Sequence, residues 1–378
     1  MNFDINNFIQ IRHDLHKLPE LGFSEVNTKK KIAKFLSEIG LEVHEGIGIV
    51  GVLKVGNNRK IIALRADMDA LPITEKSIHN YISKHVGKMH ACGHDGHMAM
   101  LMGAAKKLSS SRNFDGTVIF IFQPNEEHGL GAQAMIEEGL FENFPISEIY
   151  AIHNLPGAPL GQVSTRVGQI CSSESLFEIE LKGKGGHASM PHIGKDVITI
   201  GAELIVSLQT IVSRKLRAGA GAVVSVTEFI SDGQRNVLPG NAIIRGDVRT
   251  RNPLDRDLIK DFIGKICQGI AIGHEIETDY SFTTGFIETI NAPKPTQSVI
   301  NTANELSLDV IPDREVMSFS EDFAHFSNLV PGCFLLLGNG ENSPNNFPLH
   351  SAFYDFNDEL LPIGISLWEK LVLNCLPK

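Results

Sequence analysis

The chain has 378 residues, of which 42% are hydrophobic and 21% are charged, so it can bury a large core and is expected to form two domains. Its formal net charge is −10, and its 34 lysines and arginines are scattered rather than gathered into a stripe, so nucleic acid is not expected as a partner. The five cysteines are odd in number and widely spaced, and they imply no disulfide framework.

The N-terminal segment predicts a protein that is neither secreted nor inserted in a membrane. Residues 1–22 lack the basic start and the continuous apolar run of a signal peptide. No later stretch reaches the roughly 18 consecutive apolar residues of a membrane span. We therefore expect a cytoplasmic protein with no membrane contact.

The chain is predicted to open with two helices. Apolar residues recur at helical spacing from Ile5 to Leu18. A second helix is expected from Ser24, a typical N-cap residue, to Gly40, a typical C-terminal stop.

Short continuous apolar runs follow the two helices at residues 61–64, 118–122 and 334–337, and helical patterns such as residues 98–108 separate them. Strands that are buried on both faces and alternate with helices are typical of a parallel sheet. The pattern therefore predicts an α/β fold, with a mostly parallel sheet sandwiched by helices.

The middle of the chain has a different pattern. From Ser175 apolar and polar residues alternate, as expected for a strand with one face in water. The periodicity then predicts the order β-α-β-β-α-β, a ferredoxin-like α+β unit, over residues 174–287. The sequence thus predicts a discontinuous first domain, residues 1–173 and 288–378, with a second domain inserted into it.

The densest group of reactive side chains is MHACGHDGH, residues 89–97, just before a predicted helix. Cys92 and His94 are two residues apart in a loop, and a thiolate with a neutral imidazole suits a borderline-soft divalent metal. Considered singly, Cys92 would be interpreted as a small buried side chain and His94 as a capping residue. The density of the cluster favours a metal site.

Two adjacent carboxylates, Glu126 and Glu127, follow the predicted strand at 118–122. Such a pair is usually a solvated charge pair, but ligands of α/β proteins bind outside the carboxyl ends of the strands. One carboxylate can bind a metal while the other remains free as general base and acid.

Other polar side chains are predicted at the same edge of the sheet. Asp67 and Asp69 follow the strand at 61–64, His153 follows a short strand, and His350 lies in a loop after the strand at 334–337. Considered singly, His153 and His350 would be interpreted as ordinary histidines rather than as metal ligands. Asp67 and Asp69 fit the role of residues that cap or orient loops equally well.

The inserted domain carries two further motifs. GKGGHASMPH, residues 183–192, contains His187 among glycines, and RNVLPG, residues 235–240, contains Asn236. Each fits an ordinary turn with an exposed polar side chain as well as it fits a binding loop.

Seven motifs occur in the order seen in one family. They are RADMDALP (65–72), MHACGHDGH (89–97), QPNEE (123–127), HN (153–154), GKGGHASMPH (183–192), SEDF (320–323) and PLHS (348–351). Over essentially its whole length the chain resembles the aminoacylase and carboxypeptidase-like di-metal peptidases. The resemblance is to the branch of hippurate hydrolases, N-acyl-amino-acid amidohydrolases and auxin-conjugate hydrolases.

The resemblance implies a di-zinc exopeptidase-like fold. It also implies two bound divalent metal ions, and zinc, manganese, cobalt and nickel are the candidate metals. The metal ligands that it implies are Cys92, His94, Glu127, His153 and His350. It implies that Glu126 is the general base, and that the inserted domain is a lid and forms a homodimer or a dimer-based oligomer. His187 and Asn236 match residues that hold the substrate.

The chain departs from the family in two places. More distant relatives use a His-x-Asp pair in the segment of Asp67 and Asp69, and a bridging Asp in place of Cys92, so both aspartates are left outside the ligand set. Asp69 is a candidate for supporting a ligand. The branch usually has Ala where Asn125 stands, which predicts a more polar wall beside Glu126.

The implied reaction is hydrolysis of N-acyl amino acids, with acetyl, benzoyl or similar acyl groups, to a carboxylic acid and a free amino acid. One alternative is a dipeptidase or carboxypeptidase, which needs an acidic partner for the substrate ammonium, and the sequence does not identify one. The other is a catalytically silent amino-acid or peptide-binding protein, which would be expected to have lost Glu126 or a ligand.

Overall fold

The computed structural model describes residues 3–378, which form two compact units. Unit 1 holds the residues up to Ile170 together with Thr289–Glu315 and Glu321–Lys378, and unit 2 holds Cys171–Glu288 and Val316–Ser320. The sequence did not predict that residues 316–320 join unit 2. They do so because the Ser172 N–H donates to the carbonyl groups of Met317 and Phe319, both at 3.1 Å.

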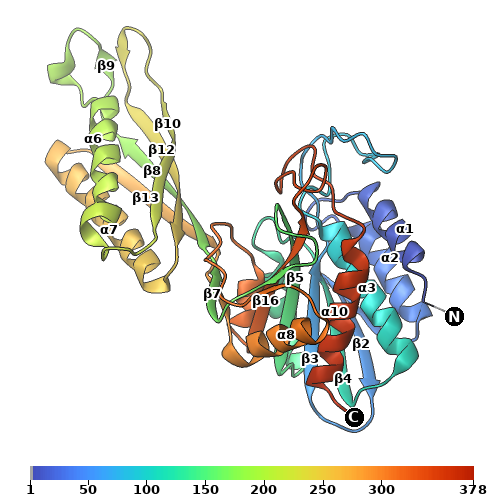
Figure 1. The fold of residues 1–378 in the computed structure, drawn as a ribbon. Helices are drawn as coiled ribbons and strands as arrows, with labels where there is room; N and C mark the ends of the chain where they lie inside the picture. Colours follow the sequence, from blue (N-terminus) through green and yellow to red (C-terminus); the bar gives the residue numbers. More distant parts are fainter. Residues whose placement is uncertain (1–2) are drawn as a thin grey trace. The chain divides into compact units, whose positions relative to one another are not determined.

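Unit 1 is built on an eight-stranded sheet with the strand order β1-β2-β4-β3-β5-β16-β6-β15 (Figure 1). Its strands are β1 (Glu42–Glu45), β2 (Ile49–Val55), β3 (Ile61–Asp67), β4 (Gly116–Gln123), β5 (Glu148–Pro156), β6 (Val163–Ser164), β15 (Val310–Ile311) and β16 (Gly332–Gly340). The central strands β4, β3, β5 and β16 are parallel to one another. A separate two-stranded ladder joins β7 (Gly168–Cys171) and β14 (Thr289–Asn291). The predicted mostly parallel sheet is confirmed.

Helices cover both faces of this sheet. They are α1 (Ile5–His16), α2 (Val26–Glu38), α3 (His94–Ser111), α4 (Gly131–Glu137), α5 (Leu140–Asn143), α8 (Pro293–Glu305), α9 (Phe323–Ser327) and α10 (Leu360–Cys375). Alternate strand residues such as Leu64, Phe120 and Leu335 share one core with α1, α2, α3 and α10. The intervening strand residues face the opposite side, where α4 contacts β4, and α9 contacts β5 and β16.

The two predicted N-terminal helices are present with small shifts at their ends. In α1, the side chain of the N-cap residue Asp4 accepts a hydrogen bond from the Asn6 N–H. The N-cap of α2 is Glu25 rather than Ser24, so the sequence-based choice of cap was wrong. Gly40 lies just beyond the helix with a φ of +83°, as expected of a C-terminal stop.

Unit 2 has the order β-α-β-β-α-β and a four-stranded antiparallel sheet, β10-β12-β8-β13. Its main elements are β8 (Ser173–Lys182), α6 (Val197–Thr210), β10 (Val223–Ser231), β12 (Asn241–Thr250), α7 (Pro253–His274) and β13 (Glu277–Phe286). The shorter elements are β9 (Gly186–His187), a 3-10 turn (Pro191–Ile193), a π-helical turn (Ile211–Lys215) and β11 (Val237–Leu238). Alternate residues of β8 pack with α6 and α7, as the ferredoxin-like prediction requires.

Within residues 3–378, one helix is long and apolar enough to cross a membrane by length and composition, namely Val197–Lys215. The sequence analysis did not predict this. Its buried side chains, among them Leu204 and Leu208, belong to the core of unit 2 together with residues of β8 and β12. Since 33% of the segment is buried, it packs one face on the core of unit 2 and leaves other apolar side chains exposed.

Candidate metal centre

The five predicted metal ligands meet at the carboxyl ends of the parallel strands of unit 1. Cys92 precedes α3, His94 begins α3, Glu127 follows β4, His153 lies in β5 and His350 lies in the loop after β16. Their donor atoms form overlapping groups in which all atoms lie within 4.8 Å of one another. We call these five residues the ligand cluster.

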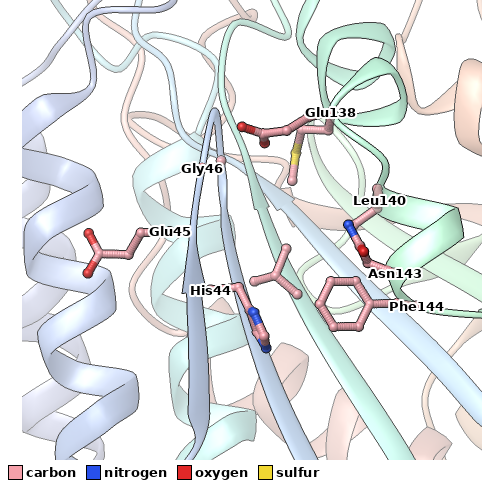
Figure 2. Close-up of a pocket in the computed structure, with 10 residues that line it drawn as sticks. His44, Glu45, Gly46, Glu138, Leu140, Asn143 and Phe144 are labelled. Carbon is pink, nitrogen blue, oxygen red and sulfur yellow. The ribbon is translucent and has the colours of Figure 1, made fainter.

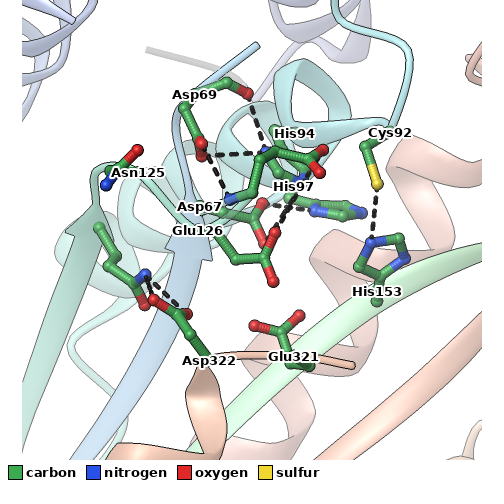
Figure 3. Close-up of polar contacts among 12 residues, drawn as sticks. Asp67, Asp69, Cys92, His94, His97, Asn125, Glu126, His153, Glu321 and Asp322 are labelled. Atoms are coloured by element: carbon green, nitrogen blue, oxygen red, sulfur yellow. Dashed lines mark hydrogen bonds and ion pairs between the residues drawn. The ribbon is translucent and has the colours of Figure 1, made fainter. Parts of the chain in front are cut away.

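Cys92, His94 and His153 form one of these groups, and all three side chains are buried. The Cys92 Sγ lies 3.4 Å from the His153 Nε2 (Figure 3). The His153 Nδ1 is 2.7 Å from the carbonyl oxygen of Asn154, which fixes the Nδ1–H tautomer. The Nε2 of His153 is therefore the ring nitrogen that carries no proton and faces the thiol.

Cys92, Glu127 and His350 form the second group. The Glu127 Oε2 lies 3.3 Å from the His350 Nε2. His350 has a left-handed backbone, with a φ of 65°, and its N–H donates to the Ala91 carbonyl at 2.8 Å. This backbone bond holds the C-terminal loop against the segment that carries Cys92.

His94 connects the two groups. Its Nδ1 lies 2.8 Å from the carbonyl oxygen of Asp69, so the Nδ1–H donates there. Its Nε2 is buried, lies 3.8 Å from the Glu127 Oε1, and has no hydrogen-bond partner among residues 3–378. The Glu127 Oε1 likewise lacks one within the described chain.

Buried polar atoms without partners are costly, and here they converge with a thiol and imidazoles. Cys92, His94 and His153 offer sulfur and nitrogen, and Glu127 offers oxygen. This donor set is the one that zinc and similar divalent ions prefer. The residues therefore fit divalent metal ions.

Glu126 stands beside the ligand cluster and is 5% exposed. Its Oε2 lies 4.0 Å from the His94 Nε2. Burial and the carboxylates of Glu321 and Glu127 raise the pKa of Glu126 well above its ordinary value. Its carboxyl group is thus able to hold a proton at the edge of the cluster.

A buried network beneath the cluster was not predicted from the sequence. The Arg65 guanidinium donates to the Gln123 Oε1 at 2.8 Å, to the Asp67 Oδ2 at 2.7 Å, and to Glu321 and Asp322 at 2.9 Å each. Burial alone would lower the pKa of Arg65, but Glu321 and Asp67 outweigh it and raise the pKa. The sequence signal was an arginine directly after the buried strand run 61–64.

The same network continues through His97, on α3. Its Nδ1 is 2.7 Å from the Asp67 Oδ1, and its Nε2 is 2.8 Å from the Asn154 Oδ1. The Asn154 amide donates to the Tyr354 hydroxyl at 2.6 Å. We call Arg65, Asp67, His97, Gln123 and Asn154 the supporting network.

Gly93 lets the Cys92–His94 turn lie close to this network. Its φ is +95°, in the left-handed region that favours glycine. A Cβ at this position would lie 2.2 Å from the Asn154 Oδ1 and 2.5 Å from the Tyr354 hydroxyl. Only glycine fits without displacing the side chains that fix His97.

Asp69 and Asn125 are two further residues that the sequence analysis placed beside the ligand cluster. Asp69 supports two ligands, because its carbonyl accepts from His94 and its Oδ2 accepts from the Glu127 N–H at 3.0 Å. The more polar wall expected beside Glu126 stays a prediction. The Asn125 Oδ1 is 2.7 Å from the His128 Nδ1, and the side chain lies on the far side of Glu126 from Cys92 (Figure 3).

The predicted substrate-binding residues lie together in unit 2. His187 pairs with Val237 in the β9–β11 ladder, and the Ala188 N–H donates to the Asn236 carbonyl. Both His187 and Asn236 are exposed. The His187 Nδ1 accepts from the Ser189 N–H at 3.1 Å, so the ring carries its proton on Nε2.

A separate pocket of about 440 Å³ lies between the β1–β2 hairpin and the α4–α5 segment (Figure 2). His44, Glu138 and Phe144 are among its lining residues. Of the residues that line it in the described part of the chain, none is a predicted site residue. The metal centre is therefore a different site.

The peptidase family M20/M25/M40 matches residues 63–374. Hippurate hydrolase from Campylobacter jejuni is 40% identical, covering 98% of this chain and 96% of its own length. N-acetyldiaminopimelate deacetylase from Priestia megaterium is 34% identical, covering 97% of each chain. Among solved structures, a dinuclear metal-binding peptidase of the M20 family from Bacillus subtilis is 31% identical, with a TM-score of 0.86 and 98% coverage of each chain.

Proposed function

Because the chain belongs to the peptidase family M20/M25/M40, we propose that it hydrolyses the amide bond of N-acyl amino acids to a carboxylic acid and a free amino acid. It is a metal-dependent amidohydrolase that takes two divalent metal ions. The observation that carries the proposal is the ligand cluster with Glu126 beside it, at the edge of the sheet where α/β enzymes bind substrates.

We propose that Cys92, His94, Glu127, His153 and His350 hold the two ions, which are zinc, manganese, cobalt or nickel. When bound, such ions supply Lewis acidity, which polarises the amide carbonyl and lowers the pKa of water to near neutrality. The supporting network holds the ligand-bearing segments in register for this task. Asp69, outside this network, also supports the ligands, because it fixes both the His94 ring and the Glu127 backbone.

Glu126 is proposed as the group that moves the proton. Its carboxylate takes a proton from the attacking water onto Oε2, holds it while the tetrahedral carbon forms, and donates it to the leaving nitrogen. Burial and the neighbouring carboxylates of Glu321 and Glu127 raise the pKa of Glu126, which makes its carboxylate a stronger base for the first transfer. The leaving amine thus departs as a neutral group.

His187 and Asn236 are proposed to bind the substrate from unit 2, the lid of the enzyme. The Nε2–H of His187 is a donor suited to the oxygen of the amide that becomes negative during the attack. Asn236 offers an exposed amide on the adjacent strand. The two side chains together would orient an acylated amino acid.

We propose that unit 2 also forms a homodimer. Its large exposed apolar side chains support this, among them Val206 at 69% exposure and Ile230 at 51%. Light scattering of the purified protein would give the mass of one chain if this proposal is wrong.

We also propose that the protein is cytoplasmic. In the described residues, 3–378, all five cysteines are buried and none forms a disulfide, as is usual in a reducing compartment.

The test of function is the hydrolysis of N-acetyl and N-benzoyl amino acids by the native protein and by Glu126→Gln. The glutamine keeps the size of the side chain but cannot take the proton, so we expect kcat to fall by about 10²–10⁴-fold. Metal content measured in parallel shows that the variant retains both ions. An unchanged kcat would contradict the role of Glu126, and faster cleavage of unacylated dipeptides by the native protein would favour a dipeptidase.

A further inference from the structure

A second group of possible metal ligands lies in unit 1 outside the ligand cluster. It consists of His16, the last residue of α1, and of Glu75 and His79 in segment 74–90, which connects β3 to α3. One donor atom from each residue lies within 4.8 Å of the other two. The reaction proposed above uses none of the three.

The distances within this group are close to those of a metal site. The Glu75 Oε1 lies 3.1 Å from the His16 Nε2 and 3.0 Å from the His79 Nε2. Tetrahedral zinc with bonds of 2.0–2.1 Å places its ligand atoms roughly 3.3 Å apart. Small side-chain adjustments would therefore place all three atoms around one ion.

Each of the three side chains is held by a contact behind its donor atom. The His16 Nδ1 is 2.9 Å from the Asp95 Oδ2, which is the carboxylate–histidine arrangement that commonly orients a metal ligand. The second oxygen of Glu75 accepts from the Ser83 N–H at 2.6 Å. The His79 ring stacks on Tyr81 with their centroids 3.8 Å apart.

His79 supplies a separate indication. Both of its ring nitrogens are buried and lack a hydrogen-bond partner among residues 3–378. The Nε2 is close to Glu75, but the contact does not have the geometry of a hydrogen bond. A buried nitrogen without a partner lowers stability, and a cation on the Nε2 lone pair would satisfy that atom.

The surrounding charge also favours a cation. The Arg12 guanidinium lies beside this group, and its nitrogens lie within 3.3 Å of three carboxylates. These three carboxylates are Asp95, Asp355 and Asp358. Glu75, in the group itself, is a fourth. Asp95 and Glu75 outweigh the effect of burial and raise the pKa of His16 to about 9, so these carboxylates attract positive charge to the position of the His16 ring. A divalent cation bound between His16 and Glu75 would supply that positive charge in place of the proton.

We propose that His16, Glu75 and His79 bind a further divalent cation, zinc or a metal of similar ligand preference, and that this cation fastens segment 74–90 to α1. The segment leads directly to Cys92, and Asp95, which holds His16, follows His94. The cation would therefore stabilise the approach to the metal centre without taking part in the reaction. The proposal does not rest on the proposed function.

The test compares zinc binding by the native protein, His79→Gln and the control His85→Gln. His85 lies in the same segment and is exposed, and its Nδ1 contacts the Pro19 carbonyl rather than the group. Each protein is dialysed against buffered free zinc and its zinc content per chain is measured. We expect His79→Gln to bind one zinc fewer than the other two proteins, with at least about 100-fold weaker binding at this site. Equal zinc content in all three proteins would overturn the proposal, whatever the number held by the catalytic centre.

Cobalt titration of the native protein gives a second measurement that does not depend on a variant. Cobalt bound beside Cys92 gives thiolate-to-metal absorption, whereas cobalt at His16, Glu75 and His79 has no sulfur ligand. We expect an additional equivalent that adds visible ligand-field absorption without further thiolate absorption. The proposal would be overturned if the ligand-field absorption and the thiolate-to-metal absorption stopped increasing at the same amount of added cobalt.

Discussion

The ligand cluster and the supporting network lie next to each other in unit 1 and use similar side chains, but they differ in how their polar atoms are bonded. In the ligand cluster the His94 Nε2 and the Glu127 Oε1 are buried without a hydrogen-bond partner among residues 3–378. In the supporting network Arg65 donates to four side chains, and both ring nitrogens of His97 are engaged.

This difference distinguishes atoms that bind a ligand from atoms that hold the binding residues in place. A buried atom without a partner lowers stability unless something occupies it, whereas a fully bonded network rigidifies its surroundings. Changes in the network should therefore affect folding first, and changes in the cluster should affect metal binding first.

The largest effect is expected for Arg65→Met. The substitution leaves Asp67, Glu321 and Asp322 buried without their cation, so the free energy of unfolding should fall by about 3–5 kcal/mol. Urea unfolding measures this change. The control is Arg112→Met, an exposed arginine that donates to the Lys54 carbonyl, and it should change stability by less than about 1 kcal/mol. Equal losses in the two variants would show that the network does not stabilise the fold.

A smaller effect on folding and a larger one on metal binding are expected for Gly93→Ala. The new Cβ would displace Asn154 or Tyr354, and with them the turn that aims Cys92 and His94. We expect zinc affinity at the catalytic centre to fall by about 10–100-fold, measured by competition with a chelator.

Gly87→Ala separates this clash from the cost of a left-handed backbone. Gly87 has a φ of +79°, similar to the +95° of Gly93, but nothing lies within 4 Å of its built Cβ. This control should lose stability of about 1 kcal/mol and keep its zinc affinity. Equal loss of affinity in both variants would mean that backbone strain, not contact with the supporting network, explains the effect.

The sequence predicted the fold and the neighbourhood of the site because both depend on local patterns. The runs at 61–64, 118–122 and 334–337 are apolar on both faces, which identifies central parallel strands, and the polar residues after such strands must meet at one edge. The structure brings the five predicted ligands together for this reason.

The supporting network was not predictable in the same way, because its contacts join distant parts of the chain. Arg65 binds Glu321, which lies 256 residues further along, and no pattern near Arg65 shows that this partner exists. An arginine after a strand is usually interpreted as a surface residue. A short-range contact was missed as well, because the Asn125 Oδ1 is 2.7 Å from the Nδ1 of His128, only three residues away.

The smallest effect is expected for Glu25→Gln, at the rear of the turn that carries Glu126 and Glu127. The Glu25 Oε1 accepts from the Asn125 N–H at 2.9 Å, and burial raises the pKa of this carboxyl from its ordinary 4.5 to about 7. The folded state therefore binds the proton more tightly than the unfolded state. The cost of a buried carboxylate is fully present above pH 7, declines as the pH falls toward 4.5, and is absent below it.

The glutamine side chain of this variant would keep the acceptor for the Asn125 N–H but carry no charge. The variant should be more stable than the native protein by about 1–2 kcal/mol at pH 8 and no more stable at pH 4.5, as measured by urea unfolding at each pH. The same gain at both values would mean that the benefit comes from packing. No gain at pH 8 would mean that the bonds around Glu25 already compensate its charge, as those around Arg65 do, and Glu25 would then belong with the supporting network.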